Sequence, residues 1–298
     1  MTQSQRQWKG KTGGGNWGQK ALLFLFRFLD VRIGYFFVAL TIPFYMLAGR
    51  KSYLAIFHFY TRRLHYPSVK AFFNVFSNYF RFGQVILDRF SVLARGKSNF
   101  TVSIEGKDTF ERRIYDRNGF VVVSSHVGNF ELSGYLFPQN LKKIYSLVYG
   151  GETAVIQSAR QSQFGMNNVE AVPVSDDMSH LFIMNTAIRK GEIVCMPADR
   201  ILGSQKFIAT EFLGKEARFP LGPFIFAAVE DIPLVSFFVI KISSKKYKLY
   251  IREIGCDDIY ENPRLKADGL LRNFVGVLEN MVKKYPAQWF NFYEFWNH

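Results

Sequence analysis

The stretch from Phe120 to Pro138 constrains the fold more than any other part of the chain. It begins with the apolar, β-branched run FVVV, which is typical of a buried strand. Two serines and His126 follow, then a short turn with Gly128 and Asn129, then a helix-like segment from about Phe130. In α/β sheets, ligands and chemistry concentrate where a strand ends and a helix begins. The sequence therefore predicts that His126 lies at a functional edge of a sheet.

Glu131 follows His126 by five positions. Within one helix this spacing would place the two side chains about 140° apart, so they would not share a face. With His126 on the turn and Glu131 in the first helical turn, the two can meet. A carboxylate on one ring nitrogen fixes the histidine tautomer and leaves the other nitrogen as a general base. We expect this catalytic pair, although the spacing also suits a polar strand end followed by an acid that favours a helix N-terminus.

The rest of the chain alternates between strand and helix patterns. Strands are expected at residues 100–104, 144–149, 169–174, 193–197, 207–213, 234–242 and 247–254, and helices at 53–65, 67–95, 108–118, 152–163, 178–190, 222–229 and 265–285. This order predicts an α/β fold with a mixed, mostly parallel sheet flanked by helices, in which 234–242 and 247–254 form a hairpin. We expect a basic lead-in and anchor helix at 1–50, a helical region at 51–98, and the α/β core at 99–298.

The N-terminal region is strongly apolar from Ala21 to Ala48. Charged residues interrupt its first half, and the uncharged remainder, Ile33–Ala48, has only 16 residues and contains Pro43. That is short of the roughly 20 residues that a span needs. Arg50 and Lys51 follow, which suits the anionic cytoplasmic leaflet of a membrane. We expect a helix embedded in or tilted through one membrane; the alternative is a buried core helix.

The net charge of +14 fits a nucleic acid, an anionic membrane or a phosphorylated ligand as partner. An aromatic content of 17%, with 32 Phe, favours the last two, and the sequence carries no nucleic-acid-binding motif. Cys195 and Cys256 lie far apart and suggest no disulfide framework, so a reducing compartment is expected. The histidines other than His126 form no ligand-spaced cluster with it, so we expect no metal.

Four blocks of sequence, in order, carry a resemblance to a known family. HVGNFE resembles the H-x4-[DE] motif of the bacterial lipid A biosynthesis acyltransferases, the Kdo-dependent lauroyl and myristoyl transferases of the lysophospholipid-acyltransferase-type superfamily. GEIVCMPADR, FLGKEARFPLGPFIFAAVEDIPLVSFFVI and PAQWFNFYEFW resemble its later blocks. The resemblance covers roughly Trp8 to Trp296. The family usually follows the aspartate at Asp199 with Gln, where this chain has Arg200.

The resemblance implies a membrane-associated acyltransferase of lipopolysaccharide biosynthesis with a glycerolipid-acyltransferase-like fold. It would act at the cytoplasmic face of the bacterial inner membrane and move a fatty acyl chain from an acyl-carrier-protein thioester to a hydroxyl of a lipid A precursor. No cofactor is expected beyond the acyl donor, and the motif leaves acyl-CoA open as that donor. It also leaves the acyl-chain length open.

The expected mechanism makes His126 the base that takes the proton from the acceptor hydroxyl, with Glu131 as its orienting carboxylate. The thioester is already activated, so no acyl-enzyme is required. Backbone amides at Val127 and Gly128 are the first candidates for the oxyanion, with Arg200 as a second choice. The expected substrate-binding residues, some of which can hold phosphates of the acceptor or of phosphopantetheine, are Asn129, Asp199, Arg200, Arg160 and Arg218. We expect Asp199 to order its loop by accepting backbone or arginine hydrogen bonds.

Three alternatives stay open. The acceptor can be another lipid or a polyene-type hydroxyl, because the dyad does not encode the acceptor and Arg200 departs from the family pattern. The chain can be a non-catalytic membrane-binding protein on the same fold, although His126 and Glu131 are both present. Charge alone also permits a nucleic-acid binder, which a salt-dependent titration would test.

Overall fold

In the computed structural model of the chain, the described residues are 15–95, 100–130, 132, 141–148, 168–175, 177–201, 206–256 and 262–296. The glycine-rich start of the lead-in and the helix expected at 152–163 lie outside the described residues.

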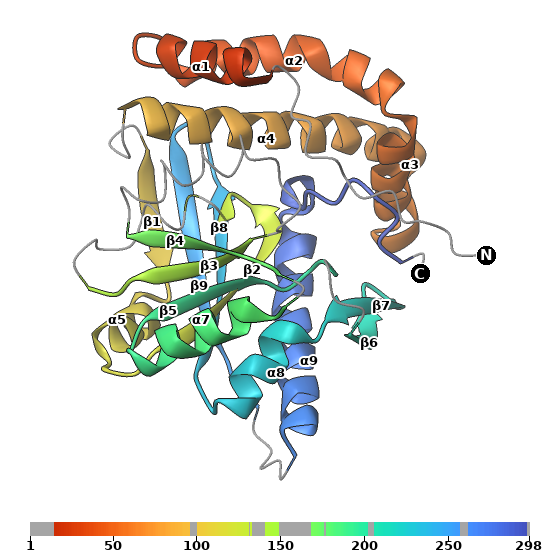
Figure 1. Cartoon of the computed structure of the whole chain (residues 1–298). Coiled ribbons are helices and arrows are strands. Elements are labelled where there is room, and N and C mark those ends of the chain that lie inside the picture. Colours follow the sequence, from red (N-terminus) through yellow and green to blue (C-terminus); the bar gives the residue numbers. More distant parts are fainter. Residues whose placement is uncertain are drawn as a thin grey trace.

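A seven-stranded sheet forms the centre of the molecule (Figure 1), in the order β1-β9-β8-β2-β5-β3-β4. Its strands are β1 Thr101–Glu105, β2 Phe120–Gly128, β3 Ile144–Val148, β4 Val169–Pro173, β5 Ile193–Pro197, β8 Leu234–Lys241 and β9 Lys246–Ile254. The hairpin β8–β9 is antiparallel, and the other described pairings in this sheet are parallel. The mixed, mostly parallel sheet expected from the sequence is confirmed.

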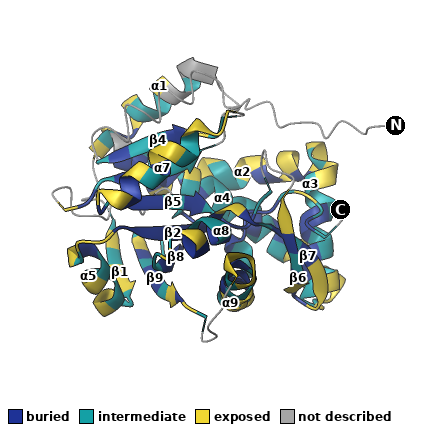
Figure 2. Cartoon of the chain, turned by 60° about the horizontal axis from the view of Figure 1, so that its bottom comes forward, coloured by how far each residue is buried: buried dark blue, intermediate teal, exposed yellow. Residues whose placement is uncertain are grey.

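Strand β2 lies inside the sheet and is buried on both of its faces (Figure 2). Val121 and Val123 belong to one core, which also contains buried side chains of the helices α7, α8 and α9. Phe120 and Val122 belong to a second core that includes Ile114 of α5. Burial on both faces explains why this strand has a continuous apolar run instead of an alternating pattern.

Helices cover the sheet and extend beyond it on one side (Figure 1). They are α1 Gly15–Leu25, α2 Val31–Ala48, α3 Arg50–His58, α4 Ser68–Arg95, α5 Lys107–Tyr115, α7 Ser179–Arg189, α8 Gly222–Val229 and α9 Pro263–Lys284. A π-helical turn, Phe59–Arg63, continues α3 and replaces the second half of the helix expected at 53–65.

A separate antiparallel hairpin consists of β6 Phe207–Phe212 and β7 Lys215–Pro220. The sequence predicted one extended piece here and missed the second strand. Leu213 and Gly214 connect the two strands with φ of 53° and 72°. Two-residue hairpin turns require positive φ, which Gly adopts freely, but Leu at such a position gives no turn signal in the sequence.

The apolar N-terminal region forms two helices, where the sequence predicted one anchor. Asp30 ends the first segment and caps α2, because its side chain accepts a hydrogen bond of 3.0 Å from the Arg32 amide. Helix α2 lies along α4 on its outer side (Figure 1). By length and composition α2 is apolar enough to cross a membrane, and most of it is exposed, which excludes the core-helix alternative.

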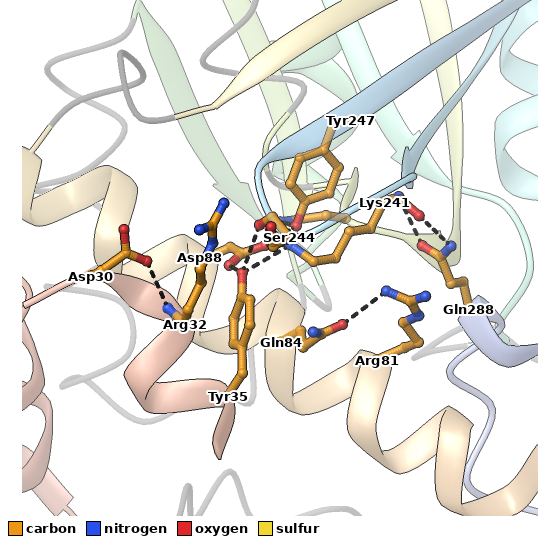
Figure 3. Close-up of polar contacts among 11 residues, drawn as sticks. Asp30, Arg32, Tyr35, Arg81, Gln84, Asp88, Lys241, Ser244, Tyr247 and Gln288 are labelled. Carbon is orange, nitrogen blue, oxygen red and sulfur yellow. Dashed lines mark hydrogen bonds and ion pairs between the residues drawn. The ribbon is translucent and has the colours of Figure 1, made fainter. Parts of the chain in front are cut away.

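A buried polar cluster fastens α2 to the α/β core (Figure 3). Asp88 of α4 and Lys241 of β8 form an ion pair whose two side chains are fully buried. Lys241 Nζ also donates to the hydroxyl of Tyr35 in α2, at 2.9 Å, and the hydroxyl of Tyr247 in β9 donates to the Asp88 carboxylate. Burial raises the pKa of Asp88 and lowers the pKa of Lys241, so each charge depends on the other to remain ionised.

Candidate active site

His126 lies within strand β2, close to its end, and not in a turn after it. The strand runs to Gly128, five residues beyond the apolar run that predicted its end, and its pairing with β8 is irregular between Ser124 and Gly128. The extension has a partner far away in the sequence. The Phe290 amide donates to the His126 carbonyl at 2.8 Å, and Val127 forms an antiparallel bridge with Trp289.

The backbone directly after His126 is tightly fixed. Gly128 has φ of 73°, and a Cβ at this position would collide with the Val239 carbonyl oxygen, so the turn requires glycine. Asn129 is buried, and its amide donates to the same Val239 carbonyl at 2.7 Å. Its side-chain amide lies 3.5 Å from the Tyr247 hydroxyl. Both of these polar contacts tie Asn129 to the protein, and its predicted role in substrate binding stays a prediction.

Asp199 is the carboxylate that contacts His126 in the structure. Its Oδ1 lies 2.8 Å from His126 Nδ1, and its Oδ2 accepts a hydrogen bond of 2.8 Å from the His126 amide. Asp199 follows β5, which pairs with β2 so that Ser124 faces Pro197. The Ala198 amide donates to the Ser124 carbonyl at 2.9 Å and carries this pairing on to the aspartate. Strand order therefore brings together two residues that are 73 positions apart.

The electrostatics of this pair keep Asp199 ionised. Asp199 is 1% exposed, and this burial alone would raise its pKa. The charge of His126, its two hydrogen bonds and the charge of Arg200 outweigh burial, so the pKa of Asp199 is lowered overall. An ionised carboxylate accepts, so in the neutral form of His126 the proton lies on Nδ1 and Nε2 keeps its lone pair. The His126 side chain is 21% exposed, and in the described part of the chain Nε2 has no hydrogen-bond partner. Nε2 is therefore available as a base.

Arg200 contacts the C-terminal segment. One terminal nitrogen of its guanidinium donates to the Phe290 carbonyl, and the guanidinium carbon lies 5.6 Å from the centre of the Tyr293 ring. Its Nε is buried and has no partner among the described residues. The sequence analysis assigned Arg200 to substrate binding and, as a second choice, to the oxyanion, and no local pattern pointed to Phe290.

The other predicted site residues are Val127, Gly128, Glu131, Arg160 and Arg218. The Val127 amide donates to the Ser125 hydroxyl at 3.3 Å. Arg218 lies on β7 of the separate hairpin, with its guanidinium carbon 4.4 Å from the Phe207 ring centre. Glu131 and Arg160 lie outside the described residues, so their predicted roles stay predictions. No cluster of three or more metal-ligating side chains occurs in the described ranges.

Comparisons with known proteins cover most of the chain. A sequence model of the family described as bacterial lipid A biosynthesis acyltransferase matches residues 75–298. No curated protein matches the chain. Among solved structures, the chain is similar to the 1-acyl-sn-glycerophosphate (LPA) acyltransferase PlsC from Thermotoga maritima. That match has 13% identity and a TM-score of 0.35, and covers 84% of this chain and 98% of that one.

Proposed function

The chain belongs to the bacterial lipid A biosynthesis acyltransferase family, and from this premise we propose that it moves a fatty acyl chain from an acyl-carrier-protein thioester to a hydroxyl of a lipid A precursor. One observation carries the chemical part of the proposal. His126 presents an Nε2 near the surface that bonds no described residue, while a buried, ionised carboxylate holds Nδ1 and the backbone amide of the same residue. This is the arrangement that a general base for a hydroxyl nucleophile needs.

In the proposed reaction, His126 Nε2 removes the proton of the acceptor hydroxyl as its oxygen attacks the thioester carbonyl. The resulting imidazolium is stabilised by the charge of Asp199, which lies 2.8 Å from Nδ1. Collapse of the tetrahedral intermediate breaks the carbon–sulfur bond, and the proton on Nε2 passes to the departing thiolate. General-base catalysis of this kind contributes about 10²–10⁴-fold. We keep Glu131 as a second candidate for the orienting carboxylate and the amides of Val127 and Gly128 as candidates for the oxyanion; the Val127 amide would have to leave the Ser125 hydroxyl to serve there.

The N-terminal helices support a site at the surface of a membrane. Helix α2 lies along α4 and exposes a row of large apolar side chains on its opposite side. These side chains are Ile33, Phe36, Phe37, Leu40, Phe44, Tyr45 and Leu47, and Phe24 and Phe28 continue the row on the α1 side. Because α2 is packed lengthwise on the protein, we propose that it lies in the interface of the cytoplasmic leaflet and does not span the bilayer. A lipid acceptor would then approach from the same leaflet.

The experiment is an acyl-transfer assay on the purified full-length protein in detergent, with an acyl-carrier-protein donor and a lipid A precursor as acceptor. We expect turnover by the wild type and a loss of about 10²–10⁴-fold in a folded His126→Ala variant. His180→Ala is the matched control, because His180 belongs to α7 and bonds Ser175 instead of the site. Near-normal turnover by His126→Ala would overturn the mechanism.

The same assay separates the alternatives. Replacing the donor by acyl-CoA and the acceptor by lysophospholipids or polyene-type alcohols identifies a different substrate pair. No turnover with any pair would favour a non-catalytic membrane-binding protein on the same fold.

A further inference from the structure

The peptide groups of His126 are held from two sides by the chain. On one side its amide donates to Asp199 Oδ2 at 2.8 Å. On the other side its carbonyl accepts from the Phe290 amide at 2.8 Å. Arg200, the neighbour of Asp199, donates to the Phe290 carbonyl. The two adjacent residues Asp199 and Arg200 therefore close a ring of contacts around the peptide of His126, one directly and one through Phe290.

The C-terminal segment that contains Phe290 is a built part of the core and not a loose tail. Trp289 and Phe290 are both buried. Asn78 of α4 donates to the Trp289 carbonyl at 3.0 Å, and Trp296 Nε1 donates to the Phe212 carbonyl at 3.2 Å. These contacts anchor the segment on both sides of Phe290 without Arg200. Removal of the Arg200 contact should therefore loosen the backbone at Phe290 while the rest of the segment stays in place.

From these contacts we infer that Arg200 is a positioning residue, which fixes the Phe290 carbonyl so that the Phe290 amide holds His126 in register with Asp199. Arg200 then acts on the reaction through the protein instead of through a phosphate of the substrate. The inference rests on the proposed function for its kinetic part alone. It explains why one arm of the guanidinium is committed to a backbone carbonyl next to the catalytic histidine.

Two substitutions separate the roles of Arg200. Arg200→Met keeps a long side chain but removes both the donor and the charge. Arg200→Lys keeps a donor, the charge and the reach, and loses the planar fork that binds a phosphate bidentately. A positioning residue that uses one hydrogen bond tolerates Lys and not Met, whereas a bidentate phosphate ligand tolerates neither. Arg272→Met is the matched control, because Arg272 lies exposed on α9 and pairs with Asp268.

The first measurement is steady-state kinetics with each substrate varied at saturation of the other. For Arg200→Met we expect kcat to fall by about 10- to 100-fold, because small misplacements of a catalytic group have effects of this size. We expect the KM values of donor and acceptor to stay within about twofold, and Arg200→Lys to restore most of kcat. A raised acceptor KM in both variants at preserved kcat would overturn the inference and assign Arg200 to substrate binding.

The second measurement does not depend on activity. Amide hydrogen exchange of the peptides that contain His126 and Phe290 should be faster in Arg200→Met than in the wild type, Arg200→Lys or Arg272→Met. Unchanged exchange in Arg200→Met would refute the inferred positioning role of Arg200, whatever the kinetics show. If the wild type transfers no acyl group with any substrate pair, the proposed function fails, and the exchange result still decides whether Arg200 holds the His126 peptide.

Discussion

Replacing Asp199 by Asn should switch the tautomer of His126. Both oxygens of Asp199 accept, one from the His126 amide and one from Nδ1, each at 2.8 Å. Asn has one accepting oxygen and one donating amide group. The His126 backbone N–H can only donate, so the Asn oxygen must face it and the Asn amide must face Nδ1. Nδ1 then accepts, the ring proton moves to Nε2, and the nitrogen required as the base is blocked.

The expected loss follows from this switch. Blocking the general base removes about 10²–10⁴-fold from kcat, which corresponds to about 3–5 kcal/mol of transition-state stabilisation. In Ser-His-Asp triads the equivalent Asp to Asn change lowers kcat by about 10⁴ for the same tautomeric reason. The fold should persist, because the Asn oxygen keeps the bond to the His126 amide and the substitution removes a buried charge instead of adding one.

The assay combines kcat at saturating substrates with ¹⁵N NMR of the histidine-labelled protein, in which five histidines are present. Glu131→Gln is the comparison variant, since Glu131 is the carboxylate that the sequence spacing favoured. We expect Asp199→Asn to lose more activity than Glu131→Gln and to show the Nε2–H form of His126. A folded Asp199→Asn variant with near-normal kcat, or with Nδ1 still protonated, would refute the reasoning.

Three further predictions follow from the structure. Asp88→Leu should lower the free energy of unfolding by about 3–5 kcal/mol, because it leaves the charge of Lys241 buried without its partner. The double variant Asp88→Leu/Lys241→Met should recover most of this loss, as measured by thermal unfolding in detergent. Deletion of residues 1–50 should move part of the protein from the membrane fraction to the soluble fraction. The rest should stay on the membrane, because α4 also exposes apolar residues. A full-length protein that is soluble without detergent would contradict this. Because the pKa of Asp199 is lowered on folding, its carboxylate stabilises the fold fully above about pH 4. This stabilisation is lost as the pH falls through the pKa of Asp199 in the folded state, so Asp199→Asn should flatten the acid side of a plot of melting temperature against pH.

Local patterns were enough for most of the elements. The expected strand at 193–197 and helix at 222–229 coincide with β5 Ile193–Pro197 and α8 Gly222–Val229. Strand β5 begins two residues after the turn glycine Gly191, helix α8 begins at Gly222, and both have a length that separates strand from helix. Strand β7 was missed because KEARFP ends in proline and has only two apolar residues before it, Ala217 and Phe219, which are too few for a clear strand pattern although both are buried. Its pairing with β6 is visible in the structure alone.

The candidate site was predictable in its residues but not in their partners. His126 and Asp199 were each identified from their position after an apolar run, while the carboxylate partner was expected five positions away, at Glu131. Spacing along one segment can rank local partners, and it carries no information about which strands are neighbours. The contact between His126 and Asp199 depends on the pairing of β2 with β5. The contact with Phe290 depends on the return of the C-terminal segment to β2, which has no local signal either.

The same C-terminal segment also joins the site to the N-terminal helix α2. The side chain of Gln288 bonds both the amide and the carbonyl of Lys241, at 2.9 and 2.8 Å (Figure 3). The Lys241 side chain in turn holds Tyr35 of α2 and the Asp88 carboxylate. Two residues after Gln288, the Phe290 amide holds His126. Packed, hydrogen-bonded contacts and not a flexible linker therefore connect the apolar surface of α2 with the proposed catalytic base. If α2 lies in the leaflet as proposed, such a connection would set the height of Nε2 above the membrane through the fold itself.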